Sequence, residues 1–143
     1  MTTPDPSTRS VIVEREFPHP PEKVWRALTE SSLIEQWLLK NDFQPVVGHS
    51  FKFSREPMPN WNGVIDCQVL AVEPGQTLSY TWATLGFGTI VTFTLTPTDA
   101  GTHLRMEQSG FHSDQEANYK GAKYGWRGFI GKLEGVVAGM QTA

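Results

Sequence analysis

The C-terminal part of the chain, residues 118–140, has the sequence NYKGAKYGWRGFIGKLEGVVAGM. Placed on a helical wheel, its apolar side chains share one sector roughly 120° wide, which is the pattern of a helix that packs one face on a core. The stretch therefore predicts a long C-terminal helix. The apolar face consists of Ala122, Trp126, Phe129, Ile130, Leu133, Val136, Val137 and Met140.

Another sector of the same helix holds only glycine: Gly121, Gly125, Gly128, Gly131, Gly135 and Gly139. A glycine inside a helix is less favourable than alanine by roughly 0.5–1 kcal/mol, so six on one face call for a reason. We expect a close approach to the helix backbone by a strand of the sheet, by the short helix at Pro21, or by a second subunit in a homodimer. The alternative is a plain solvent-exposed face.

Upstream of this helix, residues 49–110 change to the two-residue period of strands. Phe51 and Phe53, for example, alternate with Lys52 and Ser54. Similar runs, separated by short turn sequences, lie at 63–72, 78–82, 91–96 and 103–107. Five such runs in succession predict an antiparallel meander with one apolar face.

The N-terminal part adds a strand and two short helices. Residues 10–17 (SVIVEREF) alternate as a strand does, and Arg15 shares the apolar face, where it needs a partner. Proline suits the first turn of a helix, so PPEKVWRALTE predicts one short helix, and SSLIEQWLL (31–39) predicts a second. We therefore predict an α+β fold: a mobile tail at residues 1–9, then a single domain over residues 10–143.

Composition excludes several classes of function. The chain has 143 residues, one domain's worth, and its net charge of −3 argues against a nucleic-acid partner. The lone cysteine, Cys67, excludes an internal disulfide and a multi-cysteine zinc site, and its apolar neighbours predict a buried packing role. No apolar run approaches the roughly 20 residues of a membrane span, and no targeting segment is visible, so we expect a cytoplasmic protein.

Four stretches together resemble one known family. They are EREFPHPPEKVWRALTESSLIEQWL, EPGQTLSYTW, THLRMEQSGF and YGWRGFIGKLEGVV, and the resemblance covers roughly residues 10–140. They are similar to homologues of the activator of heat-shock protein 90 ATPase, in the SRPBCC (START-like) superfamily. The resemblance implies a helix-grip fold, in which a curved antiparallel sheet wraps around the C-terminal helix and leaves a cavity between them. It also implies a small hydrophobic ligand, lipid-like or polyketide-like, since many members of the superfamily bind such molecules.

In a helix-grip fold the inward-facing residues of sheet and helix would converge on that cavity. We expect its few polar contacts to come from Gln108, Tyr80 and Trp61. In many members of the family a histidine stands at the position of Gln108, so a role that needs a titratable group there does not carry over. The predicted cavity residues are Trp37, Phe53, Trp61, Ile65, Tyr80, Trp82, Val91, Phe93, Met106, Gln108, Trp126, Phe129 and Ile130. The alternative is a solidly packed core.

Three functions stay open, led by non-catalytic binding of a hydrophobic or aromatic molecule. A cyclase- or aromatase-like enzyme needs a titratable group inside the cavity, for which Arg15 and His112 are the best candidates. A chaperone-associated module needs a sizeable apolar patch. The chaperone activator itself makes most of its chaperone contact through a separate N-terminal domain, for which this chain has no room, so we keep a chaperone partner only as the less favoured alternative. The histidines lack metal-ligand spacing and no phosphate-binding glycine motif is present, so we expect no metal and no cofactor.

Overall fold

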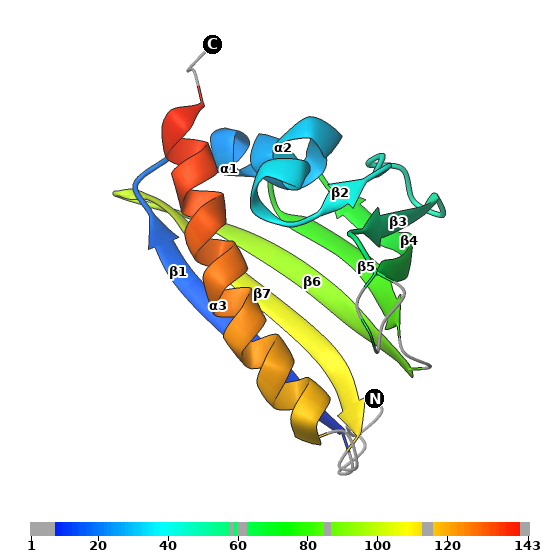
Figure 1. Ribbon diagram of the computed structural model, residues 1–143. Coiled ribbons are helices and arrows are strands. Elements are labelled where there is room, and N and C mark those ends of the chain that lie inside the picture. The colour runs from blue at the N-terminus through cyan, green and yellow to red at the C-terminus, as the bar shows by residue number, and fades with distance from the viewer. Residues whose placement is uncertain (1–7, 58, 60–62, 85–86, 113–115, 141–143) are drawn as a thin grey trace.

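A curved antiparallel sheet wraps around one long helix (Figure 1). The structure is a computed structural model, and it describes residues 8–57, 59, 63–84, 87–112 and 116–140. This arrangement confirms the predicted helix-grip fold. Within the described ranges the elements are β1 (Thr8–Phe17), α1 (Pro21–Thr29), α2 (Ser31–Trp37), β2 (Lys40–Asn41), β3 (Ser50–Ser54), β4 (Val64–Glu73), β5 (Thr77–Thr84), β6 (Phe87–Thr98), β7 (Gly101–His112) and α3 (Glu116–Gly139).

The strands of the described chain form a seven-stranded sheet in the order β1-β7-β6-β5-β4-β3-β2. From β2 to β7 each strand pairs with its neighbour in sequence, which confirms the predicted meander. β1 then pairs antiparallel with β7, placing Val13 opposite Met106 and Phe17 opposite Thr102. The short strand β2 was not predicted, because two residues are too few to show an alternation.

β1 begins at Thr8, so the predicted tail of residues 1–9 is too long by two residues. Arg9 explains the extension, because its guanidinium pairs with Glu116 at the start of α3. The same group lies 4.0 Å from the ring centre of Tyr119, a cation–π contact. Residues 1–7 lie outside the described part of the chain.

The two short helices follow β1 and lie beside the C-terminal half of α3 (Figure 1). Pro20 is extended and Pro21 occupies the first turn of α1, where a missing N–H breaks no helical hydrogen bond. α2 ends at Trp37, two residues before its predicted end. The Trp37 indole N–H donates to the carbonyl oxygen of Ala27 at 2.9 Å, which ties the two helices together.

α3 turns its predicted apolar face toward the concave side of the sheet. Trp126, Ile130, Leu133 and Val137 are at most 2% exposed, which confirms the helical pattern. Arg15 has the partner that its place on β1 requires, since its guanidinium lies 2.6 Å from the Glu134 carboxylate of α3. Like the other described helices, α3 lacks the continuous apolar stretch that crossing a bilayer requires.

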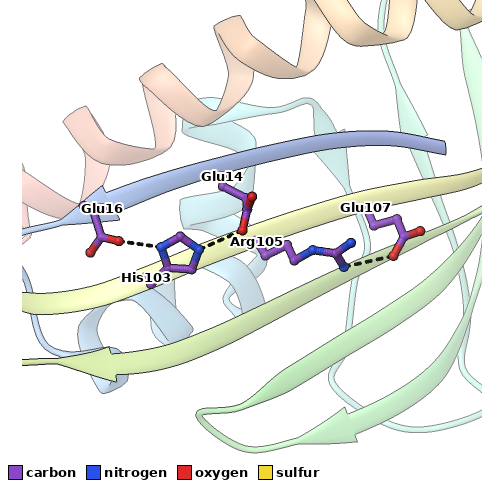
Figure 2. Close-up of polar contacts among 5 residues, drawn as sticks. All are labelled: Glu14, Glu16, His103, Arg105 and Glu107. Carbon is purple, nitrogen blue, oxygen red and sulfur yellow. Dashed lines mark hydrogen bonds and ion pairs between the residues drawn. The ribbon is translucent and has the colours of Figure 1, made fainter.

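The outer face of the sheet, opposite α3, carries a charged cluster (Figure 2). His103 of β7 lies between two carboxylates of β1: its Nε2 is 2.9 Å from Glu14 Oε1 and its Nδ1 is 2.5 Å from Glu16 Oε1. Beside them, the Arg105 guanidinium lies 3.0 Å from the Glu107 carboxylate. Hydrogen bonds to Glu14 and then to Glu16 raise the pKa of His103 above its ordinary value.

This cluster predicts a pH-dependent contribution to stability. Because the pKa of His103 is higher in the folded chain than its unfolded value of about 6.5, the contribution is complete below that value and is lost as the pH rises through the folded pKa. We expect His103→Gln to lower the melting temperature at pH 6 and to lower it less at pH 9. In a Glu14→Gln/Glu16→Gln background the difference between pH 6 and pH 9 should disappear. A His103→Gln effect of equal size at both pH values would show that the carboxylates do not act through the imidazolium.

Candidate functional site

A pocket of about 280 Å³ opens between α3 and the concave face of the sheet. Its walls come from β5, β7 and the first half of α3. The described lining carries no ionisable side chain, so the pocket is neutral and mostly apolar there. The described lining residues are Trp82, Thr84, Gln108, Phe111, Ala117, Asn118, Gly121, Ala122, Gly125, Trp126 and Phe129.

Aromatic rings form the inner wall of this pocket. The ring centres of Trp82 and Trp126 are 5.3 Å apart, and that of Phe129 is 5.7 Å from Trp126. From behind, Phe53 packs on Trp82 at 5.3 Å and Phe93 on Trp126 at 5.9 Å. These ring contacts hold the wall in place, since edge-on and tilted aromatic pairs are favourable beyond the area that they bury.

A chain of buried hydrogen bonds links this wall to the sheet. The Trp126 indole N–H donates to Gln108 Oε1 at 2.7 Å, and Gln108 Nε2 donates to Thr89 Oγ1 at 2.8 Å. The Thr89 hydroxyl in turn donates to the carbonyl oxygen of Trp82 at 3.1 Å. Trp126, Gln108 and Thr89 are all less than 5% exposed, so this chain is shielded from water.

The structure brings four of the predicted cavity residues into the lining: Trp82, Gln108, Trp126 and Phe129. Trp61 lies outside the described residues. The others are buried in the core beyond the described lining, because alternation identifies the inward face of a strand but not where the helix lifts away from it. These residues are Trp37, Phe53, Ile65, Tyr80, Val91, Phe93, Met106 and Ile130.

Tyr80 and Cys67 illustrate this core. The Tyr80 ring lies 5.2 Å from Phe51 and 6.0 Å from Phe53, and burial raises the pKa of its hydroxyl well above the ordinary value. Burial, and to a lesser extent Asp66, also raises the pKa of the Cys67 thiol. A thiol held in its protonated form is a poor nucleophile, which agrees with the predicted packing role.

The two titratable candidates for catalysis are not part of the described lining. Arg15 pairs with Glu134 on the flank of α3, and His112 is exposed at the end of β7. General acid–base chemistry needs a titratable group within reach of the ligand. Neither position supplies one in the described pocket.

The glycine face of α3 is open. A Cβ atom at Gly121, Gly128 or Gly135 would meet nothing within 4 Å, and one at Gly125 would come no nearer than 3.9 Å to the Phe129 ring. At Gly131 the Cβ position lies 3.9 Å from the Arg15 guanidinium of β1, which is an ordinary contact. The predicted close approach of a strand or of α1 to the helix backbone is therefore wrong for the described chain. A subunit contact over this face stays a prediction.

Gly121 and Gly125 line the pocket instead, and their role as wall residues was missed. They stand one helical turn apart, with Phe129 one turn further, so their spacing was the available signal. Thr84, Phe111, Ala117, Ala122 and Asn118 were also missed as lining residues. Ala122 already lay on the predicted apolar face of the helix, whereas the positions of the other four carry no comparable signal.

A second hollow, of about 440 Å³, lies between α2 and α3. Its polar side chains, Gln36 and Lys132, are exposed, so they are already hydrated. A ligand would therefore gain less binding free energy in this hollow than in the first pocket. Its described lining consists of Leu33, Gln36, Lys132, Gly135, Val136, Gly139 and Met140.

Comparison with known proteins gives the family. Residues 18–138 match the family described as Activator of Hsp90 ATPase homolog 1-like protein. The chain belongs to this family. The match confirms the resemblance seen in the sequence, and it supports a ligand-binding role in general terms. No curated protein matches the chain significantly.

Solved structures share the fold of this Activator of Hsp90 ATPase homolog 1-like chain. Protein MLL2253 from Mesorhizobium loti is 56% identical, with a TM-score of 0.87 over 94% of this chain and 100% of its own. Protein BH1534 from Bacillus halodurans is 28% identical, with a TM-score of 0.77 over 90% of this chain and 96% of its own. CalU16 from Micromonospora echinospora, 21% identical, has a TM-score of 0.77 over 94% of this chain and 81% of its own, and shares the fold alone.

Proposed function

We propose that this protein binds a small neutral molecule with an aromatic or apolar skeleton in the pocket between α3 and the sheet, without catalysing a reaction on it. The observation that carries the proposal is the pairing of an aromatic wall with two helix glycines, Gly121 and Gly125, across a space of about 280 Å³. Each glycine lowers helix stability by roughly 0.5–1 kcal/mol relative to alanine. No described side chain fills the room they leave, so the room is open to a ligand.

The volume favours a ligand of about two fused rings. An apolar cavity of roughly 150 Å³ is enough to hold benzene. The pocket here, at about 280 Å³, is nearly twice that size. Pockets for drug-sized molecules begin at about 300 Å³, so a long lipid would extend beyond the described lining.

The lining also favours a neutral ligand. An ionised group that enters an apolar site loses its hydration and needs an opposite charge to compensate. The described lining offers no charged side chain, and its polar atoms belong to the neutral residues Thr84, Gln108 and Asn118. A carboxylate or ammonium ligand would therefore stay in water.

The two alternatives have less support. An enzyme would need a titratable group in the pocket, and the described lining has none. A chaperone-associated module would need a contiguous apolar patch. Among the exposed large apolar residues of the described chain, only Val46 and Val47 are neighbours in sequence; the others are Ile12, Leu70, Ile90 and Tyr124.

Titration with indane, a bicyclic hydrocarbon, tests the proposal. In nitrogen-15 correlation spectra we expect saturable shifts of the indole N–H signals of Trp82 and Trp126, which line the pocket. The indole of Trp37, bonded to the carbonyl of Ala27 in the core, serves as an internal control and should not move. Unchanged Trp82 and Trp126 signals at the solubility limit of indane, or an equal shift of Trp37, would refute binding in this pocket.

A further inference from the structure

We propose that Gln108 presents one side-chain N–H to the pocket, and that the ligand therefore carries a neutral hydrogen-bond acceptor, such as a ketone oxygen, on its apolar skeleton. This inference rests on the proposed function, and it names the chemical class of the ligand for the same pocket. It follows from how the Gln108 amide is held.

The orientation of the Gln108 amide is determined by its neighbours. An indole nitrogen can only donate, so the group that faces Trp126 Nε1 at 2.7 Å must be the amide oxygen. The amide nitrogen then faces Thr89 Oγ1 at 2.8 Å. Thr89 can accept this bond because its own hydrogen is directed to the carbonyl oxygen of Trp82. The reversed amide would set two donors against each other at Trp126, so the arrangement admits one orientation.

In this orientation one N–H of the Gln108 amide has no acceptor in the described chain. A side-chain amide nitrogen carries two hydrogens, and the bond to Thr89 takes one of them. Within the described chain no acceptor receives the second. Gln108 lines the pocket and is 3% exposed, so the pocket is where the remaining N–H can meet an acceptor.

A buried donor selects among ligands of the same shape. When a ligand fills the pocket and excludes water, an N–H without an acceptor is unfavourable, whereas one that meets a carbonyl or ether oxygen is satisfied. A neutral acceptor fits better than a carboxylate, because the described lining has no cation to balance a negative charge. The pocket therefore suits an aromatic ketone or a related neutral oxygen compound.

The test compares 1-indanone with indane, which has the same skeleton without the carbonyl, on wild-type protein and on Gln108→Glu. Glutamate keeps the shape of glutamine and can still accept from Trp126. In its neutral form its single O–H goes to Thr89, and in its ionised form it has no donor, so neither form has a hydrogen for the ligand. We expect the variant to weaken 1-indanone binding by roughly 2- to 13-fold more than it weakens indane binding, the equivalent of one ordinary hydrogen bond.

The controls separate this inference from the proposed function. Gln68→Glu on the exposed side of β4 introduces the same charge away from the pocket and should leave both affinities unchanged. Suppose that both ligands bind wild-type protein and that Gln108→Glu either weakens both affinities equally or weakens neither. The Gln108 donor is then not used by the ligand, so the inference fails while the proposed function stands. If neither ligand binds wild-type protein, the proposed function fails and the inference fails with it.

A second measurement needs no variant. The infrared carbonyl band of 1-indanone bound to the wild-type protein should lie at lower frequency than in hexane, because an N–H···O=C bond weakens the carbonyl bond. A bound band at the hexane frequency would overturn the inference even if Gln108→Glu failed to fold.

Discussion

Replacing Trp126 with alanine is expected to lower the melting temperature by on the order of 10–20 °C. Truncating a buried tryptophan destabilises a fold by roughly 3–5 kcal/mol, and a chain of this size loses a few degrees per kcal/mol. The ring is 2% exposed and contacts Trp82, Phe93 and Phe129, so its removal leaves a gap at the centre of the domain. Thermal unfolding followed by circular dichroism measures the change. Tyr124→Ala, on the same helix at a side chain that is 84% exposed, is the matched control and should change stability by less than about 0.5 kcal/mol.

A milder pair of variants separates packing from hydrogen bonding. Trp126→Phe keeps a ring but leaves Gln108 Oε1 buried without its donor, which destabilises by roughly 1–3 kcal/mol. Adding Gln108→Leu removes the unpaired oxygen, so the double variant should recover part of that loss. Two results would contradict this. One is a Trp126→Phe variant as stable as Tyr124→Ala; the other is a double variant that is destabilised by the full sum of the two single variants. Either would mean that the buried hydrogen bonds do not contribute to stability as described.

Replacing Gly125 with leucine is expected to abolish indane binding while leaving the protein as stable as wild type or more so. A Cβ atom at this position meets only the Phe129 ring, at 3.9 Å, so a side chain fits and extends into the pocket. Leucine also favours a helix over glycine by roughly 0.8–1 kcal/mol, which corresponds to a rise of about 2–6 °C in melting temperature. Calorimetric titration and thermal unfolding of the same samples measure both effects.

Gly128→Leu is the matched control for this variant. Gly128 lies three residues further along α3, has nothing within 4 Å of its Cβ position and is not part of the described pocket lining. It should gain the same helical stability and keep full indane affinity. Equal affinities of the two leucine variants would mean that the space beside Gly125 is not the binding site. A change in molecular mass by light scattering for Gly128→Leu would bear instead on the predicted subunit contact.

The fold could be predicted because its signals are periodic and local. α3 repeats its apolar pattern over 24 residues, and β5 alternates from Leu78 through Tyr80 to Trp82, so element type and buried face follow from spacing alone. The pairing of β1 with β7 joins residues about ninety positions apart, and no local pattern reports such a contact. The sequence analysis therefore did not predict it.

The site could be predicted only in part. Phe93 and Phe129 both point inward, yet only Phe129 reaches the described lining, because Phe93 packs behind the wall against Trp126. Gly125 shows the other limit. A glycine in a sequence reports that a side chain is missing, and it does not report whether a neighbouring backbone, solvent or a ligand occupies the space. Residues chosen for their size and polarity therefore included the wall of the pocket but also much of the core behind it.

The most direct test of ligand binding between α3 and the sheet is the set of intermolecular nuclear Overhauser effects from bound indane. We predict contacts to the methyl group of Ala122 and to the rings of Trp82 and Phe129, which line the pocket together. We predict none to the methyl groups of Leu33 and Met140 in the hollow between α2 and α3. Contacts to Leu33 and Met140 without contacts to Ala122, or no intermolecular contact at all, would contradict the account.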